Sequence, residues 1–272
     1  MTMTDTRRAN RRMSRPRTGR PVLRLLSQVG VLGLVLLAWQ LYYISGAGSA
    51  ALNKSPGQVW TAFTALMADG TLASNLWATM QAVIIALLLA GVVGTTIGLA
   101  LALMPRVEAA VGPMISGLNS MPRVALAPVF IIAFGIGITA KVALAFSVVV
   151  FVFLLNARAG VNSADPDIVR LARTMGLSKT QQFFKVLLPI ATPSIFAAVR
   201  LGLIYSLLGV VTSELITARD GLGQLVAQYS AGFNMAAVYA ILIVLAVVAG
   251  ILNSLTGLAE KWVLRWQAPQ GD

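Results

Sequence analysis

The residues best placed to do chemistry lie in one polar segment, residues 164–194, between two long apolar runs. Asp165 can cap a helix that opens with a proline, and Gly176 can end that helix in the left-handed conformation. Ser178, with Gln181 three residues later, has the spacing of a capping box and opens a second helix. The segment therefore predicts two short helices that meet at a glycine, and the chemistry that it offers is recognition rather than catalysis.

Each of the two predicted helices carries an apolar face. On the first, apolar residues recur at helical spacing, and on the second they precede Pro189, which we expect to end the helix. These residues are Ile168, Leu171, Ala172 and Met175, then Phe183, Phe184 and Leu187. Such faces fit a groove in a soluble partner protein. A DNA-binding helix-turn-helix is the alternative, but the 36 residues between Ala157 and Ser194 leave no room for a third helix, so we expect no nucleic acid partner.

The composition excludes most catalytic and metal chemistry. The chain has no His and no Cys, which rules out a Cys/His metal site, a Ser–His or Cys–His nucleophile and a disulfide. No lysine follows a glycine, so the phosphate-binding loop GxxxxGK[ST] is missing and the chain binds no ATP by that route. We therefore expect no catalytic residue, no metal and no cofactor in this chain, and no enzyme activity of its own.

The elements that must position the polar segment are membrane helices. Hydrophobic residues make up 57% of the chain and charged residues 11%, against about 25% charged in soluble domains. A bilayer core needs about 20 apolar helical residues to cross it. We expect an all-α, polytopic membrane protein with about six transmembrane helices, at residues 25–45, 77–104, 118–136, 140–157, 194–216 and 237–258.

The N-terminal residues set the expected domain organisation. Residues 1–24 contain eight arginines and one aspartate, which is typical of a disordered tail at a membrane surface. A cleaved signal peptide and a nucleic-acid-binding arm are alternatives, but the apolar stretch that follows is about 20 residues long, against 7–15 in a signal peptide. We expect a first transmembrane helix at 25–45, a transmembrane domain at 60–262 that includes the loop 164–189, and a cytoplasmic tail at 263–272.

Four polar residues within the predicted spans could line a solute path. Asn119, Ser120 and Arg123 could face a cavity between helices, although Arg123 could instead snorkel to the cytoplasmic surface. Glu214 is an ionisable group at membrane depth, which is a functional hypothesis by default. Because it lies near the end of its span, we favour solvation or a pair with Arg219.

The loop 164–189 resembles the EAA loop of the permease subunits of ABC importers, the binding-protein-dependent transport inner-membrane components. The pattern is Glu-Ala-Ala, three residues, Gly, nine residues, Ile, one residue and Leu-Pro. Arg170 stands here in place of the Glu and Leu171 in place of the first Ala. The resemblance implies that the loop couples the permease to an ATPase through Arg170, Leu171, Ala172, Gly176, Ser178, Phe184, Leu188 and Pro189.

Further motifs resemble the nitrate/sulfonate/taurine-type branch of these permeases: MPRVALAPVFIIAFGIG (121–137), RTMG (173–176) and GLG (221–223). The resemblance covers about residues 60–262 and implies a type I ABC importer permease-like fold in the plasma membrane. It also implies separate ABC ATPase subunits that hold ATP and an extracytoplasmic solute-binding protein. The solute would be a small anion such as a sulfonate, taurine or nitrate, or a related small organic molecule.

An ATP-independent channel or secondary carrier is the alternative function. We favour it less, because the chain lacks the paired intramembrane carboxylates of a proton-coupled carrier. Six spans make half of a transport pathway, so we expect a homodimer with a two-fold axis. Gly91, Gly94 and Gly98 in the second span let helices approach closely and could support that dimer.

The distribution of basic residues predicts the orientation of the chain in the membrane. With the N-terminus inside, sixteen basic residues lie on the cytoplasmic side and three, Lys54, Lys141 and Arg219, lie outside. By the positive-inside rule, a tag before Arg7 and a reporter after Gln267 should both report the cytoplasm. Finding either end outside would contradict the six-span topology.

Overall fold

The computed structural model describes residues 21–46, 49, 51–263 and 265, and these form helices and turns without a β-strand. The all-α class predicted from the composition is confirmed. The chain divides into two compact units, Met1–Pro56 and Gly57–Asp272, and each is described by itself.

The first unit contains one long helix, α1 (Pro21–Ile44), at the place of the predicted first span. Its stretch Leu26–Ile44 contains no buried residue, so its apolar side chains can face lipid. The indole N–H of Trp39 donates to the Lys54 carbonyl oxygen 3.0 Å away, which holds the segment after the helix against it. The tail predicted at 1–24 lies outside the described residues up to residue 20, and most of the tail predicted at 263–272 does as well.

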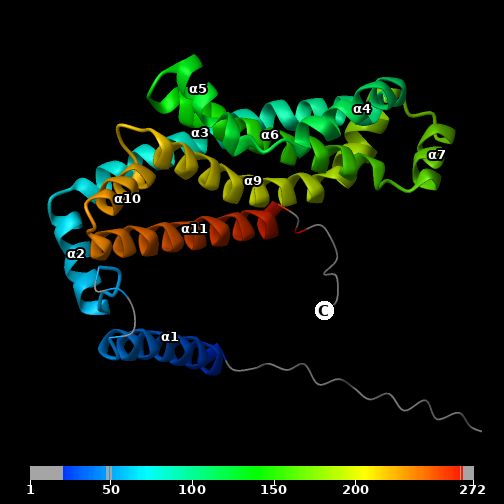
Figure 1. Ribbon diagram of the computed structural model, residues 1–272. Coiled ribbons are helices and arrows are strands. Elements are labelled where there is room, and N and C mark those ends of the chain that lie inside the picture. The colour runs from blue at the N-terminus through cyan, green and yellow to red at the C-terminus, as the bar shows by residue number, and fades with distance from the viewer. Residues whose placement is uncertain (1–20, 47–48, 50, 264, 266–272) are drawn as a thin grey trace, which may run out of the picture. The chain divides into compact units, whose positions relative to one another are not determined.

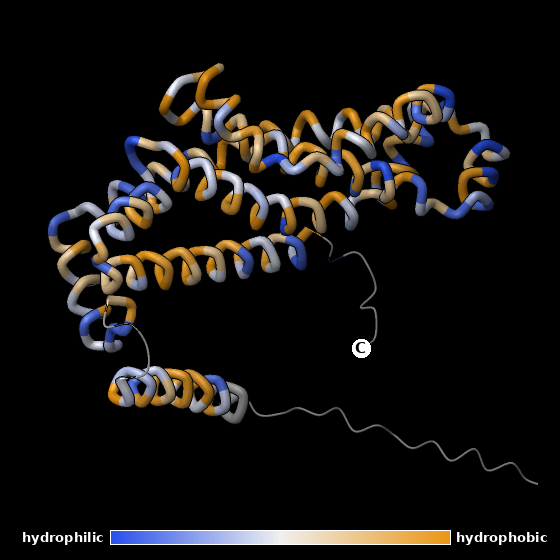
Figure 2. Tube along the Cα trace, viewed as in Figure 1, coloured by the Kyte–Doolittle hydropathy of each residue, from blue (hydrophilic) through white to orange (hydrophobic). Residues whose placement is uncertain are grey.

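The second unit holds all the other helices (Figure 1). They are α2 (Pro56–Ala68), α3 (Thr71–Leu103), α4 (Pro105–Ser120), the 3₁₀ turn η1 (Arg123–Leu126), α5 (Ala127–Phe134), α6 (Ile138–Asn162), α7 (Pro166–Thr174), α8 (Lys179–Gln182), the π-helical turn η2 (Phe183–Leu187), α9 (Leu188–Ile216), α10 (Leu222–Ala231) and α11 (Met235–Val263). Helix α6 packs against both α3 and α9 at the centre of the unit. Figure 2 shows hydrophobic residues along the long helices, whereas hydrophilic residues gather at α7 and at the turns.

The small residues of α3 serve packing within the chain. A Cβ added to Gly94 would lie 2.4 Å from the carbonyl oxygen of Val150, and one added to Gly98 would lie 2.4 Å from that of Leu154. Both positions are therefore filled by α6, and only glycine permits so close an approach of the two backbones. Our expectation that these residues support a dimer is wrong, because α6 of the same chain already covers them.

The third predicted span, 118–136, is not one helix. Helix α4 ends at Ser120, and the following pair, Pro105–Ser120 and Arg123–Phe134, is bent by 81°. Pro122 explains the break, because it lacks an N–H and keeps Met121 in an extended conformation with φ −71° and ψ 133°. The described residues contain five helices long and apolar enough to cross a membrane, or six if the bent pair counts as one span.

Pro189 also differs from the expectation. Instead of ending the second short helix, it lies in the first turn of α9, which continues directly from the π-helical turn η2. The π-helical turn directly before it accommodates the proline, because local π adjustments satisfy the backbone groups that the missing N–H would leave without a partner. The second half of the polar segment and the fifth span are consequently one continuous helical path from Lys179 to Ile216.

A buried ion cluster ties the central helices together. The carboxylate of Glu214 on α9 lies 3.0 Å from the ammonium Nζ of Lys141 on α6, with the two side chains 0% and 2% exposed. The hydroxyl of Thr79 on α3 lies 3.0 Å from both Glu214 oxygens, and the Gly223 N–H donates to Oε2 at 2.9 Å. The Lys141 ammonium also contacts Asp220 Oδ1 at 2.5 Å. Four helices thus meet at one buried carboxylate.

Two expectations are corrected by this cluster. Glu214 is neither solvated nor paired with Arg219: it is 1% exposed, and its charged partner is Lys141. Lys141 does not lie in a solvated segment outside the spans, because it is in α6 and is 2% exposed. An ionised group in a low-dielectric interior needs a partner of opposite charge, and here that partner is 73 residues away in the sequence.

The ion cluster predicts an unequal cost of single and paired substitutions. Lys141→Met leaves the buried Glu214 carboxylate without its cation, which should destabilise the fold by about 3 kcal/mol or more. The double variant Lys141→Met/Glu214→Gln should recover part of that loss, because no uncompensated buried charge remains. The thermal midpoint of the purified protein in detergent measures both.

Arg170→Ala is the matched control for this prediction. Arg170 pairs with Asp167 at 3.3 Å, but both side chains are more than three-quarters exposed. Removing such a pair should change stability by less than about 1 kcal/mol. If the stability lost by Lys141→Met/Glu214→Gln equals the sum of the losses in Lys141→Met and Glu214→Gln measured separately, the two residues are not coupled.

Candidate functional site

The capping interactions predicted for the two short helices are present. Asp165 Oδ1 accepts the N–H of Asp167 at 2.8 Å at the start of α7. Ser178 and Gln181 form the reciprocal capping box at the start of α8, with distances of 3.3 and 3.0 Å. These local bonds fix where both helices begin without any help from the long spans.

Gly176 forms the corner between α7 and α8. Its φ is +78°, in the left-handed region that favours glycine. The Gly176 N–H donates to the Arg173 carbonyl at 2.9 Å, and the Leu177 N–H donates to the Ala172 carbonyl at 3.2 Å. This pair of bonds is the Schellman motif, which ends α7 and sets the direction of the helix that follows.

The apolar face predicted on these helices is largely exposed. Ala172 is buried, but four large side chains are 47–71% exposed, namely Ile168, Leu171, Met175 and Phe184. We call these four residues the docking face. Figure 1 shows α7 beyond the ends of α6 and α9, at the opposite end of α9 from α10. Of the other residues predicted for this loop, Arg170, Ser178 and Pro189 are exposed and Leu188 is half-buried.

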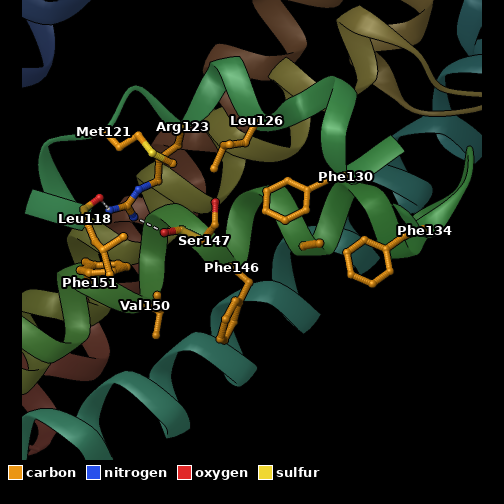
Figure 3. Close-up of a pocket in the computed structure, with 11 residues that line it drawn as sticks. Leu118, Met121, Arg123, Leu126, Phe130, Phe134, Phe146, Ser147, Val150 and Phe151 are labelled. Carbon is orange, nitrogen blue, oxygen red and sulfur yellow. Dashed lines mark hydrogen bonds between the residues drawn. The ribbon is translucent and has the colours of Figure 1, made fainter. Parts of the chain in front are cut away.

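Arg123 occupies the break between α4 and α5. Its Nη2 donates to the Leu118 carbonyl at 2.9 Å, and its Nη1 donates to the Ser147 carbonyl on α6. The guanidinium carbon lies 4.1 Å from the centre of the Phe151 ring. Arg123 is only 9% exposed, so it turns into the protein (Figure 3), and the expectation that it snorkels to the membrane surface is wrong.

Two cavities meet at Arg123. The first, which we call the Phe130 cavity, has a volume of about 470 Å³ and is almost wholly apolar (Figure 3). The second, which we call the Asn156 cavity, also measures about 470 Å³ and carries more polar groups. Both cavities share Met121 and Arg123, and the second is also lined by Asn119, Asn156, Leu201 and Tyr205.

The four residues proposed for a solute path are therefore placed differently. Asn119 and Arg123 both line the Asn156 cavity. Ser120 lines neither cavity, and its hydroxyl donates to the Ser116 carbonyl at 2.9 Å. Glu214 belongs to the buried ion cluster. Lys141 is not among the residues predicted for a site, although a lone lysine between two long apolar runs could have indicated a buried partner.

Comparisons with known proteins agree with this architecture. A model of the family "Binding-protein-dependent transport system inner membrane component" matches residues 94–267. The taurine transport system permease protein of Escherichia coli (strain K12) is 32% identical over 232 residues, which are 83% of this chain and 84% of that protein. The riboflavin transport system permease protein of Chloroflexus aurantiacus is 30% identical over 261 residues, 96% of this chain and 94% of that protein.

A putative aliphatic sulfonates transport permease protein of Bacillus subtilis (strain 168) is 28% identical over 234 residues, 86% of this chain and 85% of that protein. A chain of the MetNI methionine ABC transporter in an inward-facing crystal form has the same fold, with a TM-score of 0.65 and 19% identity. That match covers 71% of this chain and 96% of the other. These findings favour an importer over the ATP-independent channel or secondary carrier considered above. The chain belongs to the binding-protein-dependent transport inner-membrane components, the permease subunits of ABC importers, whose ATPase is on separate partner subunits.

Proposed function

We propose that two copies of this chain form the membrane path of a small anionic solute and that α7, α8 and η2 couple this path to ATPase subunits. The observation that carries the coupling role is the docking face, four exposed apolar side chains on otherwise polar helices. Exposed apolar patches of this kind mark interaction sites.

The surroundings of the docking face identify the kind of partner. Arg170, Arg173, Lys179 and Lys185 all lie within the same three short helical elements, and the capping carboxylates of α7 are close by. Such a concentration of charge is costly in the hydrocarbon core of a bilayer, so the face meets water or protein instead of lipid. A groove on a soluble ATPase subunit would cover the apolar side chains and leave the basic ones wet.

A small anion is the solute that best fits the path. Related permeases are described as transporting aliphatic sulfonates, taurine and nitrate, although another is described as transporting riboflavin. The Asn156 cavity carries a buried guanidinium, and its other polar groups are amides and a phenol. A positive, hydrogen-bonding lining is suited to an oxyanion.

The homodimer and the orientation belong to the same proposal. With the bent pair counted as one span, the described residues contain six spans, which make half of the path, and two copies related by a two-fold axis close it simply. Both termini and the docking face lie in the cytoplasm under the positive-inside rule, where ATP is available. A solute-binding protein would deliver the anion from the opposite side.

Composition of the purified complex tests the assembly. An affinity-tagged chain extracted from its native membrane should bring down an ATPase subunit, and the complex should contain two permeases of 28.7 kDa. Native mass spectrometry counts the subunits. A detergent-stable complex whose mass accommodates a single permease would refute the dimer.

Substitutions in the loop test the coupling. Gly176→Val places a β-branched residue at φ +78° but meets no atom within 4 Å, so it should strain the corner without disturbing the spans. Phe184→Asp places a charge on the docking face. We expect normal abundance of both variants and a loss of solute-stimulated ATP hydrolysis of about tenfold or more. For Gly176→Val the reason is backbone strain of about 1–2 kcal/mol, which shifts an equilibrium that far.

Lys179→Ala is the control, because this exposed lysine lies in the same loop but outside the docking face. It should leave uptake and hydrolysis close to normal. Uptake and ATP hydrolysis are measured together in vesicles that contain the permease, its ATPase and its solute-binding protein. Full coupled transport by Gly176→Val and Phe184→Asp would show that coupling runs through another element.

A further inference from the structure

Arg123 is a buried cation with no acidic partner among the residues that the structure describes. The described part of the chain contains seven acidic residues, and none of them contacts Arg123. Five of the seven take part in ion pairs with other basic residues. The remaining two, Asp69 and Asp165, accept backbone N–H groups at helix starts. The charge of Arg123 is therefore not neutralised by any described side chain.

The guanidinium is held by groups that are polar but uncharged. Its Nη atoms donate to the carbonyl oxygens of Leu118, Ser147 and Val148 and to the side chain of Asn119. No acceptor in the described residues bonds to its Nε–H. Carbonyl dipoles fix the orientation of a cation, but they leave its net charge in place, and a net charge in a low-dielectric interior attracts an anion strongly.

The position of this charge makes it accessible to a solute. Arg123 lies on the wall shared by the Phe130 and Asn156 cavities, at the break where α4 turns into α5. In the Asn156 cavity the amides of Asn119 and Asn156 and the phenol of Tyr205 share the lining with Arg123, which supplies hydrogen-bonding groups beside the charge. The Phe130 cavity offers an almost wholly apolar surface for the rest of a solute.

We propose that Arg123 is the group that recognises the anionic head of the solute in the membrane path, with Asn156 and Tyr205 lining the same binding point. The class of ligand is a small oxyanion, such as a sulfonate, a carboxylate or nitrate. The planar fork of N–H donors in a guanidinium matches two oxygen atoms of such a group. This inference rests on the proposed function as an importer of a small anion.

The absence of cysteine from the chain permits a direct test. A single cysteine is introduced by Leu155→Cys in the lining of the Asn156 cavity, and a control cysteine by Thr180→Cys on exposed α8. Each protein reacts with two thiol reagents of similar size, a methanethiosulfonate that carries a sulfonate and one that carries a quaternary ammonium. The ratio of the two rates reports the local electrostatic potential.

Arg123→Gln should lower the rate ratio of anionic to cationic reagent at position 155 by about fivefold, because both residues line the Asn156 cavity and the loss of a unit charge there changes the local potential for the two reagents in opposite directions. The ratio at position 180 should not change. Arg200→Gln is the matched control, since Arg200 pairs with Glu260 and lines neither cavity. An unchanged ratio at position 155 would overturn the proposal.

Arg123→Lys tests the proposal even if Arg123→Gln does not fold. It should preserve the rate ratio but reduce ATP-driven uptake of taurine, methanesulfonate or nitrate by about tenfold or more in vesicles that hold the whole complex, because a lysine cannot present a planar fork. Equal uptake by Arg123→Lys and the unmodified complex would overturn the proposal.

The recognition role of Arg123 and the importer function are distinguished by different outcomes. If the unmodified complex imports an uncharged solute but none of the three anions, the recognition role of Arg123 and the anionic solute of the proposed function are both wrong, whereas the coupling to an ATPase stands. If the rate ratio falls with Arg123→Gln but the complex drives no uptake with ATP, the anion-binding point stands and the proposed function is wrong.

Discussion

A charge inside a bilayer must find its compensation within the protein, and the second unit is arranged around that constraint. The carboxylate of Glu214 gathers an ammonium from α6, a hydroxyl from α3 and a backbone N–H from α10. None of these donors is near it in the sequence apart from Gly223. The cluster therefore holds α3, α6, α9 and α10 together, which the connecting loops alone would not do. The contact of Gly94 and Gly98 with α6 sets how closely α3 and α6 approach.

Arg123 meets the same constraint in a different way. Lys141 has two carboxylates within 3.0 Å, whereas Arg123 has carbonyl oxygens, an amide and an aromatic face. In the first arrangement the positive charge of Lys141 is neutralised by carboxylates, which suits a contact that holds helices together. The second keeps a positive charge on the wall of two cavities, which a purely structural residue would not require. The difference between the two cations distinguishes the ion cluster, which holds helices together, from Arg123, which lines the proposed solute path.

Local signals in the sequence were sufficient for the short helices and insufficient for the buried polar contacts. Asp165, Gly176 and Ser178 act within three residues of themselves, so their caps were predictable. Glu214 finds Lys141 73 residues away, and the nearest basic residue in the sequence, Arg219, proved a misleading guide. The bend at Pro122 had a visible signal, but the apolar run around it favoured one straight span.

Helix α9 joins these parts in a single element. It begins where η2 ends, so the docking-face residue Phe184 and the first turn of α9 belong to one helical path without an intervening loop. Leu201 and Tyr205 of α9 line the Asn156 cavity, and Glu214 lies near its far end. With 29 residues the helix is about 43 Å long. An ATPase that moved Phe184 would therefore move helix α9, whose middle part lines the Asn156 cavity. The ion cluster would hold the far end of the helix in place, because a buried ion pair resists displacement more than apolar contacts do.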